Sequence, residues 1–588
     1  MDLRTRVLGI ALGGIAALLV HASAVAAEAA AALDQLFADE RAALYAFDPL
    51  TASAEGVREH ETRMPSVSAA AQAAWLQTNE ALLARAEAIA AQELDAQQAI
   101  SLDLFRFMLQ SRIESLRFRE WRLPLNSDSG FFSEVLYLSQ WHRFDTVDDH
   151  RHYLARLADL PRYFDEQIAN LRIGMADGYT LPQAVLPGTQ KGVAATRFER
   201  AEDSPMYAPF ARMPAAIDAQ QQKSLRREAR RVIEGKVFPA YARFHEFFER
   251  EYMPAARTTL GASDLPEGAD YYAFLVRYFT TLPDADAASI HALGLAEVAR
   301  IRREMDQVIA DAEYDGDFDA FVEFLRRDPQ FYASKAVQLI ERAAYLSKTI
   351  DGELPRFFAT LPRTPYTVRP VPAALAPNYT AGRYNPGPMG AAGEYWVNTY
   401  ALHTRPLYAL PALTLHEAVP GHHLQIALAR ELEGLPRFRL NLYPHAFGEG
   451  WALYAEKLGT EMEGVYRTPY EHFGRLSYEM WRACRLVVDT GIHAKGWSRQ
   501  QAIDYLAANT ALSMHEISTE VDRYISWPGQ ALAYKIGELK IVELRAQAER
   551  ELGPKFDIKA FHQAVLANGG VTLPVMESAV QRMIDSRK

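Results

Sequence analysis

The chain has 588 residues, of which 49% are apolar and 23% are charged, so it can bury a large hydrophobic core. Its net charge of −11 argues against nucleic acid as a main partner, and no dense basic run alters that view. The single cysteine, Cys484, excludes an internal disulfide, and its apolar surroundings are typical of a core residue.

The first residues have the features of a secretory signal peptide. Arg4 and Arg6 precede an apolar run over residues 7–20, and small residues follow as far as Ala26. The run is shorter than the roughly 20 residues of a membrane span. No cysteine stands near the cleavage site to carry a lipid anchor. We therefore expect residues 1–26 to be removed, which leaves a periplasmic or secreted protein without a membrane anchor.

The remaining chain, residues 27–588, predicts a mainly α protein that forms one domain. Apolar residues spaced by three and four indicate helices within 73–104, 215–251, 285–312 and 334–351. Thr146, followed by two acidic residues, has the form of a helix start. Eight prolines between Pro355 and Pro388 exclude a long helix, and residues 394–400 are the best strand candidate. A small β patch should therefore precede the helices that resume after Leu410.

Three histidines and a glutamate lie within the eight residues from His416 to His423. A hydrolytic zinc site commonly uses two His and one Glu as ligands. His416 and His422 are six residues apart, and a regular helix would point them about 240° apart. Pro420 and Gly421 interrupt a regular helix, and a bulge there would bring His422 beside His416. We expect these two histidines to bind the metal, with His423 as the alternative second ligand.

The third ligand should come from a neighbouring helix. Glu449 and Glu456 are seven residues apart in an apolar stretch, so they share one helix face. Carboxylates are costly to bury unless they are paired or bind a metal. We expect Glu449 to complete the zinc site, Glu456 to orient a ligand histidine, and Glu417 to act as general base. The alternative is that Glu449 and Glu456 are solvated surface groups.

Four motifs carry a resemblance to a known family. They are HEAVPGHHLQ (416–425), GEGWALYAEKLG (448–459), RLVVDTGIHAKGWS (485–498) and DRYISWPGQALAYKIGELKI (522–541). In this order they resemble the bacterial family of unknown function numbered 885. That family is similar in turn to the helical zinc peptidases of the angiotensin-converting-enzyme, thimet-oligopeptidase and thermostable-carboxypeptidase groups. The resemblance implies a large helical, zincin-like domain with a deep cleft for short peptides.

The same resemblance implies groups that contact the substrate and stabilise the developing oxyanion. His515, Arg523 and Tyr524 stand in similar order and spacing to such groups, and Tyr534 is a second phenol candidate. Arg523 has the chemistry to hold a substrate carboxylate, and a phenol or imidazole can donate to an oxyanion. The two tyrosines could equally be lining or core aromatics.

Two further features have a functional and a structural interpretation. Asp489 and His493, four residues apart on a predicted helix, either support the metal ligands or form an ordinary pair on a helix face. The strand around Trp396 either binds an extended peptide along its edge or serves as scaffold.

Together these features predict an exported zinc metallopeptidase, of carboxypeptidase or dipeptidase type, that hydrolyses short peptides with water activated by the metal. The same residues would suit a metal-dependent amidase or esterase acting on a non-peptide substrate. The fold could also serve a non-catalytic binding protein, but the presence of Glu417 favours an enzyme. The sequence does not indicate the oligomeric state.

Overall fold

The computed structural model describes residues 26–373, 375–376, 379–388 and 390–588. The predicted signal peptide lies outside the described residues except for Ala26. Contacts divide the chain into two compact units, the first ending at Arg257 and the second running from Thr258 to Lys588. No linker-like composition marks this boundary, which is why the sequence indicated one domain. Within the described ranges, no helix is both long enough and apolar enough to cross a membrane.

Helices joined by short loops make up the first unit. The predicted helix start at Thr146 is present, because its hydroxyl accepts a hydrogen bond from the backbone N–H of Asp149 (3.2 Å). Asp95 caps a second helix inside the predicted stretch 73–104, which is therefore two helices. The bounds are a helix over 26–47, α2 (Pro49–Ala54), α3 (Ala69–Ala88), α4 (Ala96–Arg117), α5 (Phe131–Glu134), α6 (Val147–Ala176), α7 (Leu186–Ala194), α8 (Ala208–Ala211), α9 (Ala219–Val232), α10 (Phe238–Phe247) and α11 (Met253–Ala255).

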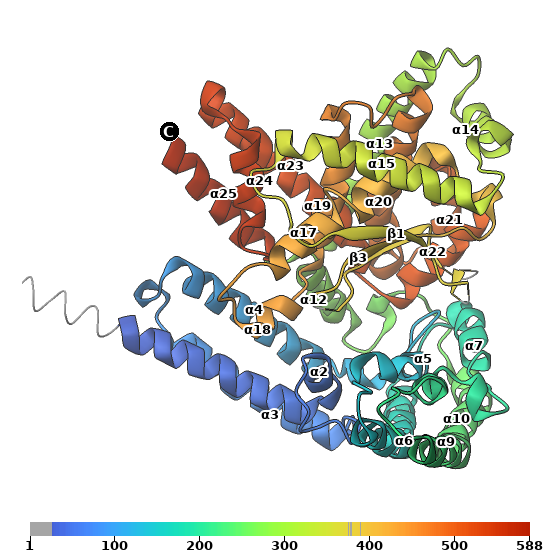
Figure 1. Ribbon diagram of the computed structural model, residues 1–588. Helices are drawn as coiled ribbons and strands as arrows, with labels where there is room; N and C mark the ends of the chain where they lie inside the picture. The colour runs from blue at the N-terminus through green and yellow to red at the C-terminus, as the bar shows by residue number, and fades with distance from the viewer. Residues whose placement is uncertain (1–25, 374, 377–378, 389) are drawn as a thin grey trace, which may run out of the picture. The chain divides into compact units, whose positions relative to one another are not determined.

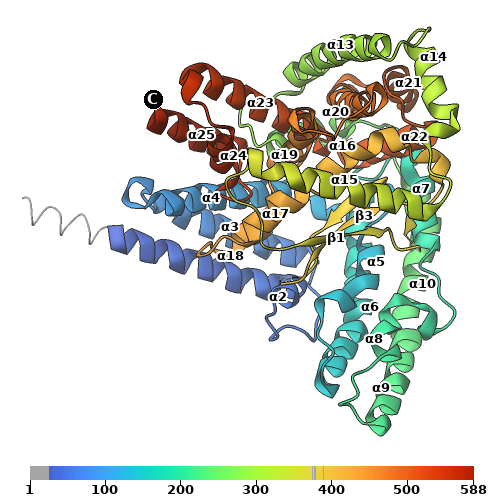
Figure 2. The same ribbon diagram turned by 45° about the horizontal axis from the view of Figure 1, so that its top comes forward.

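The second unit is mainly helical and contains every candidate site residue. Its long helix α20 is buried along most of its length and packs on α13, α16 and α21. Figure 2 shows α16 among α15, α19 and α20. The bounds are α12 (Gly268–Thr280), α13 (Ala287–Asp311), α14 (Phe318–Arg327), α15 (Ala336–Phe357), α16 (Leu410–Glu417), α17 (His422–Arg430), α18 (Arg437–Asn441), α19 (His445–Leu458), α20 (Pro469–Lys495), α21 (Arg499–Asn509), α22 (Met514–Ser526), α23 (Ala533–Leu552), α24 (Ile558–Leu566) and α25 (Leu573–Arg587).

A three-stranded sheet precedes α16 in the chain. It consists of β1 (Tyr366–Pro370), β2 (Gly382–Asn385) and β3 (Gly393–Val397), in the order β1-β3-β2. β3 is parallel to β1 and antiparallel to β2, and both β1 and β3 contact α15. Figures 1 and 2 show β1 and β3 below α15. The predicted strand is therefore present as β3. Because β3 is paired on both sides, it is scaffold and offers no free edge to a peptide.

Asp489 and His493 connect α20 to other parts of the second unit. The Asp489 carboxylate accepts hydrogen bonds from the Tyr272 hydroxyl (2.6 Å) and the Gly529 N–H (3.1 Å). His493 Nε2 donates to the backbone oxygen of Tyr524 (2.9 Å). Both side chains are fully buried. These contacts show that the two residues support the fold through separate partners on other elements, and not as a pair on one helix face.

The stability of the second unit should depend on pH through Asp489, because burial raises its pKa to about 7. An unfolded aspartate has a pKa of about 3.9, so the folded state binds the proton more tightly. The resulting stabilisation is complete below about pH 4 and is lost as the pH rises to about 7, a change of about 4 kcal/mol. In urea titrations from pH 4 to 8, the free energy of unfolding of wild type should therefore fall by about 4 kcal/mol relative to that of Asp489→Asn. A difference that is constant with pH would contradict this assignment.

Candidate metal centre

The helix that carries the histidine motif is interrupted where the sequence predicted. α16 ends at Glu417 and α17 begins at His422. Between them, the Gly421 N–H donates to the Leu415 carbonyl (2.9 Å), six residues back instead of four. The His423 N–H then donates to the Ala418 carbonyl (3.0 Å), five residues back. This turn therefore contains more residues than a regular helical turn, and the helix resumes after it.

Gly421 is required at this interruption because backbone atoms occupy the space where a side chain would start. A Cβ atom at this position would lie 2.0 Å from the carbonyl oxygen of His416 and 2.4 Å from that of Leu415. Both neighbours are backbone atoms, which cannot move aside as a flexible side chain can. The close approach fixes the start of α17 directly against the end of α16.

Three donors converge as a result: His416 on α16, His422 on α17 and Glu449 on α19. Their nearest ligand atoms all lie within 4.8 Å of one another. Glu449 Oε2 is 3.6 Å from His416 Nε2 and 3.5 Å from His422 Nε2. Ligand atoms around a tetrahedral zinc with bonds of about 2.0–2.1 Å lie about 3.3 Å apart. The donor set and its spacing therefore fit a zinc ion.

The close packing of α19 on α23 places Glu449. A Cβ atom at Gly450 would lie 2.5 Å from the Cα of Gly537, and one at Gly537 would lie 1.8 Å from the Ala446 carbonyl oxygen. The two helices therefore meet backbone to backbone. Trp451, next on α19, donates its indole N–H to the Pro420 carbonyl (2.7 Å) and so connects this helix to the interruption.

Glu456 fixes the orientation of His416. Its Oε1 lies 2.8 Å from His416 Nδ1, which leaves Nε2 directed at Glu449. Burial would lower the pKa of His416, but the Glu449 and Glu456 carboxylates raise it to about 10. Burial would raise the pKa of Glu449, but the two histidines hold it well below its usual value. The carboxylates and imidazoles of this group therefore stabilise one another's charged forms.

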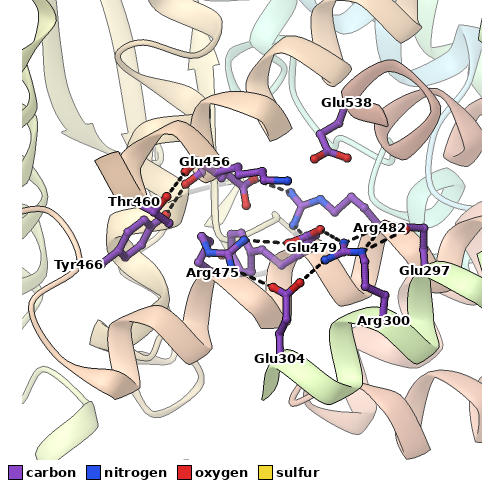
Figure 3. A network of polar contacts seen from close by, with 12 residues as sticks. Glu297, Arg300, Glu304, Glu456, Thr460, Tyr466, Arg475, Glu479, Arg482 and Glu538 are labelled. Atoms are coloured by element: carbon purple, nitrogen blue, oxygen red, sulfur yellow. Dashed lines mark hydrogen bonds and ion pairs between the residues drawn. The ribbon is translucent and has the colours of Figure 1, made fainter. Parts of the chain in front are cut away.

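A cluster of buried charges lies behind Glu456 (Figure 3). Arg482 is its nearest member, with Nη2 at 3.9 Å from Glu456 Oε1. Further in, Glu479 pairs with Arg475 (2.8 Å) and with the fully buried Lys535 (2.9 Å). The Glu479–Lys535 pair connects α20 to α23, the helix that packs on α19. Removing one partner of such a pair would leave an uncompensated buried charge.

Glu417 lies at the end of α16, outside the group of three donors. Its Oε2 accepts a hydrogen bond from the backbone N–H of Tyr384 on the outer strand β2 (2.7 Å). This is the one hydrogen bond of the Glu417 carboxylate seen among the described residues. Strand β2 therefore holds the proposed base by its backbone.

His423 has a different role from His422. Its Nδ1 lies 2.9 Å from the Tyr384 hydroxyl, and its ring contacts that of Tyr366 at 4.5 Å between centroids. Burial lowers its pKa to about 4. His423 thus connects α17 to the outer strands of the sheet, and the geometry favours His422 as the second ligand.

The other predicted site residues lie in different places in the structure. Arg523 Nη2 donates to Gln530 Oε1 (2.9 Å), and Gln530 Nε2 donates to the Tyr534 hydroxyl (3.4 Å), so Arg523 and Tyr534 belong to one polar group. The Tyr524 hydroxyl is buried and accepts hydrogen bonds from Arg485 and Trp481, both at 2.9 Å. It faces α20 instead of the three donors.

His515 is exposed on the first turn of α22. Among the described residues, no hydrogen bond or ion pair joins its imidazole to the three donors. Its place at the substrate remains a prediction of the resemblance.

Tyr443, which the sequence analysis did not identify, lies beside Glu449, one of the three donors. A Cβ atom at Gly448 would lie 2.4 Å from the Tyr443 hydroxyl oxygen, so the phenol fills the space beside the residue that precedes Glu449. Tyr443 is 37% exposed, but desolvation at its hydroxyl and the charge of the Glu449 carboxylate hold its pKa well above the usual value. In the sequence, Gly448 beside Glu449 was the one feature that could have indicated that Tyr443 packs here.

Replacing Gly421 by alanine should disrupt the metal centre. The added Cβ would collide with two backbone oxygens, so α17 would shift and His422 would leave the other donors. We expect zinc affinity, measured by competition with a chromophoric chelator, to fall at least about 100-fold. Gly352→Ala on α15 is the control, because its Cβ would meet no atom within 4 Å. Unchanged affinity in Gly421→Ala would contradict the role given to this residue.

The comparisons with known proteins agree with the four sequence motifs. Residues 49–580 match the family described as "Bacterial protein of unknown function (DUF885)". A proposed lipoprotein from Colwellia psychrerythraea has 27% identity and a TM-score of 0.86, with 94% of this chain and 99% of that chain covered.

A proposed lipoprotein of unknown function from Shewanella oneidensis has 18% identity and a TM-score of 0.71, with 93% of this chain and 99% of that chain covered; it shares the fold. No curated protein matches the chain. The match over residues 49–580 makes the chain a member of the bacterial family DUF885, whose function is unknown.

Proposed function

We propose that this protein is an exported zinc-dependent peptidase that hydrolyses short peptides. The observation that carries the proposal is the convergence of His416, His422 and Glu449, with Glu417 beside them but outside the group. Two imidazoles and one carboxylate are the ligands of many hydrolytic zinc sites, and they leave a coordination position open. A separate carboxylate next to such a group has the position of a general base.

When bound, zinc would supply a Lewis acid that polarises a carbonyl group and makes water a better nucleophile. The chain's own residues would do the rest. The Tyr384 N–H holds one oxygen of Glu417, so the other is directed to accept a proton from water and return it to the leaving amine. Glu456 keeps His416 in the tautomer that presents Nε2 to the metal.

Three further residues would contact the substrate. The Tyr443 hydroxyl lies beside the residue preceding Glu449, where a phenol could donate to the oxyanion that forms during hydrolysis. Arg523 and Tyr534, joined through Gln530, supply a cation and a second phenol. A guanidinium in this setting suits the terminal carboxylate of a short peptide. The preference for short peptides and the deep cleft rest on the resemblance to helical zinc peptidases.

Export is supported by the charged and apolar pattern of residues 4–26. The two related structures are described as proposed lipoproteins, a class of exported envelope proteins. A peptidase in that compartment would meet peptides released in the cell envelope.

Two substitutions separate metal binding from turnover. Glu417→Gln should retain zinc, because the carboxylate is outside the donor group, but should lower kcat at least about 100-fold by removing the base. Glu449→Ala should lose both zinc and activity, because it removes a donor. Zinc content by mass spectrometry and hydrolysis of a mixed short-peptide library measure the two effects. Normal turnover by Glu417→Gln would contradict the assignment of the base, and cleavage of esters but no peptides would contradict the substrate class.

A further inference from the structure

A cavity of about 270 Å³ lies in the second unit beside the first half of α16. Leu410 and Leu413 of α16 form one wall, and Val397 at the end of β3 forms another. Ser477 and Tyr478 of α20 close it from a third side. None of the donors of the metal centre lines this cavity. It is therefore a separate space next to the candidate site.

The cavity wall is suited to an apolar ring. Tyr332, Tyr408 and Tyr478 contribute aromatic surface, and leucine, valine and alanine side chains add further apolar surface. Charged side chains are also present in the wall: Arg326, Arg405 and Glu516. Several polar wall residues are already used by the fold. Asn398 donates to three backbone oxygens (2.9–3.0 Å), and Arg326 donates to the Leu512 carbonyl (2.6 Å). These hydrogen-bonding groups are therefore already paired within the protein.

Two polar atoms of residues that line the cavity have no hydrogen-bond partner among the described residues. The Ser477 hydroxyl is buried and has no hydrogen-bond partner among the described residues. Arg405, also in the wall, is 3.5 Å from Glu516 through one nitrogen, while its buried Nε has no partner. Buried donors without partners are uncommon in proteins. Neither of these atoms is exposed on the cavity surface, so the surface that an incoming group would meet is mainly apolar.

The position of the cavity relates it to the proposed reaction. Leu413 precedes His416 by three residues, about 4.5 Å along the helix axis. Ala381, another wall residue, directly precedes β2, and three residues later the Tyr384 N–H holds Glu417. Three residues of a strand span about 10 Å. An extended peptide with its cleaved bond beside Glu417 would therefore bring a side chain to the cavity from two or three residues away.

We infer that this cavity is a specificity pocket that binds an aromatic side chain of the substrate, two or three residues from the cleaved bond. The inference rests on the proposed peptidase function and adds a substrate class to it: short peptides with a tyrosine, phenylalanine or tryptophan at one fixed position.

The test uses peptides in which one aromatic residue is moved along an otherwise alanine-rich chain. The zinc-loaded wild type should prefer the aromatic residue at one position by about 10- to 100-fold in kcat/KM. Ser477→Leu on α20 and Ala511→Leu between α21 and α22 both add bulk to the cavity wall. Each should remove most of this preference, measured as the ratio of kcat/KM for the preferred peptide to kcat/KM for the all-alanine peptide. Ala508→Leu, on the exposed side of α21, is the matched control and should behave like wild type.

The outcomes are distinguishable. If the wild type cuts peptides but the cavity-filling variants keep its aromatic preference, with zinc content and circular dichroism unchanged, the inference is wrong and the peptidase proposal stands. If the variants lose the preference at one position only, the cavity is the pocket for that side chain. If zinc-loaded wild type cuts no peptide of the set, the peptidase proposal and this inference are both overturned.

Discussion

The backbone oxygens of Leu415 and His416 occupy the space in which a side chain at position 421 would begin, and the geometry of the metal centre depends on this contact. Because Gly421 has no Cβ, the chain can fold back closely enough for α17 to start at His422, beside His416. Along a regular helix, six residues would place the two imidazoles on different faces. A histidine spacing that does not suit a continuous helix thus becomes compatible with a single ion.

Electrostatics imposes the second requirement. Glu417 and Glu456 are buried, Glu449 is nearly so, and buried carboxylates are costly without partners. Glu456 faces His416, Glu417 faces the Tyr384 N–H, and Glu449 faces both histidines. A divalent cation would compensate the charge of Glu449 while leaving the other two contacts intact. Behind them, the glycine contact of α19 with α23 and the charged cluster of Figure 3 hold the helices in place.

The sequence predicted the helices, the strand before the motif and the three donors, because each depends on spacing along one or two elements. It did not predict partners that depend on how distant elements meet. Tyr443 reaches its position through the absent side chain of Gly448, and β2 holds Glu417 through a backbone N–H, which leaves no side-chain signal. Tyr524 is one residue from Arg523, yet it lies on the helix face that packs on α20. The order of residues along the chain could not distinguish these two faces.

The most direct test is the zinc content of the purified protein, measured by mass spectrometry for wild type, His422→Ala and His423→Ala. His422 lies with the other donors, whereas His423 pairs with Tyr384. We therefore expect one zinc per chain in wild type and in His423→Ala, and none in His422→Ala. Loss of zinc in His423→Ala alone, or no zinc in wild type after reconstitution, would contradict the metal centre described here.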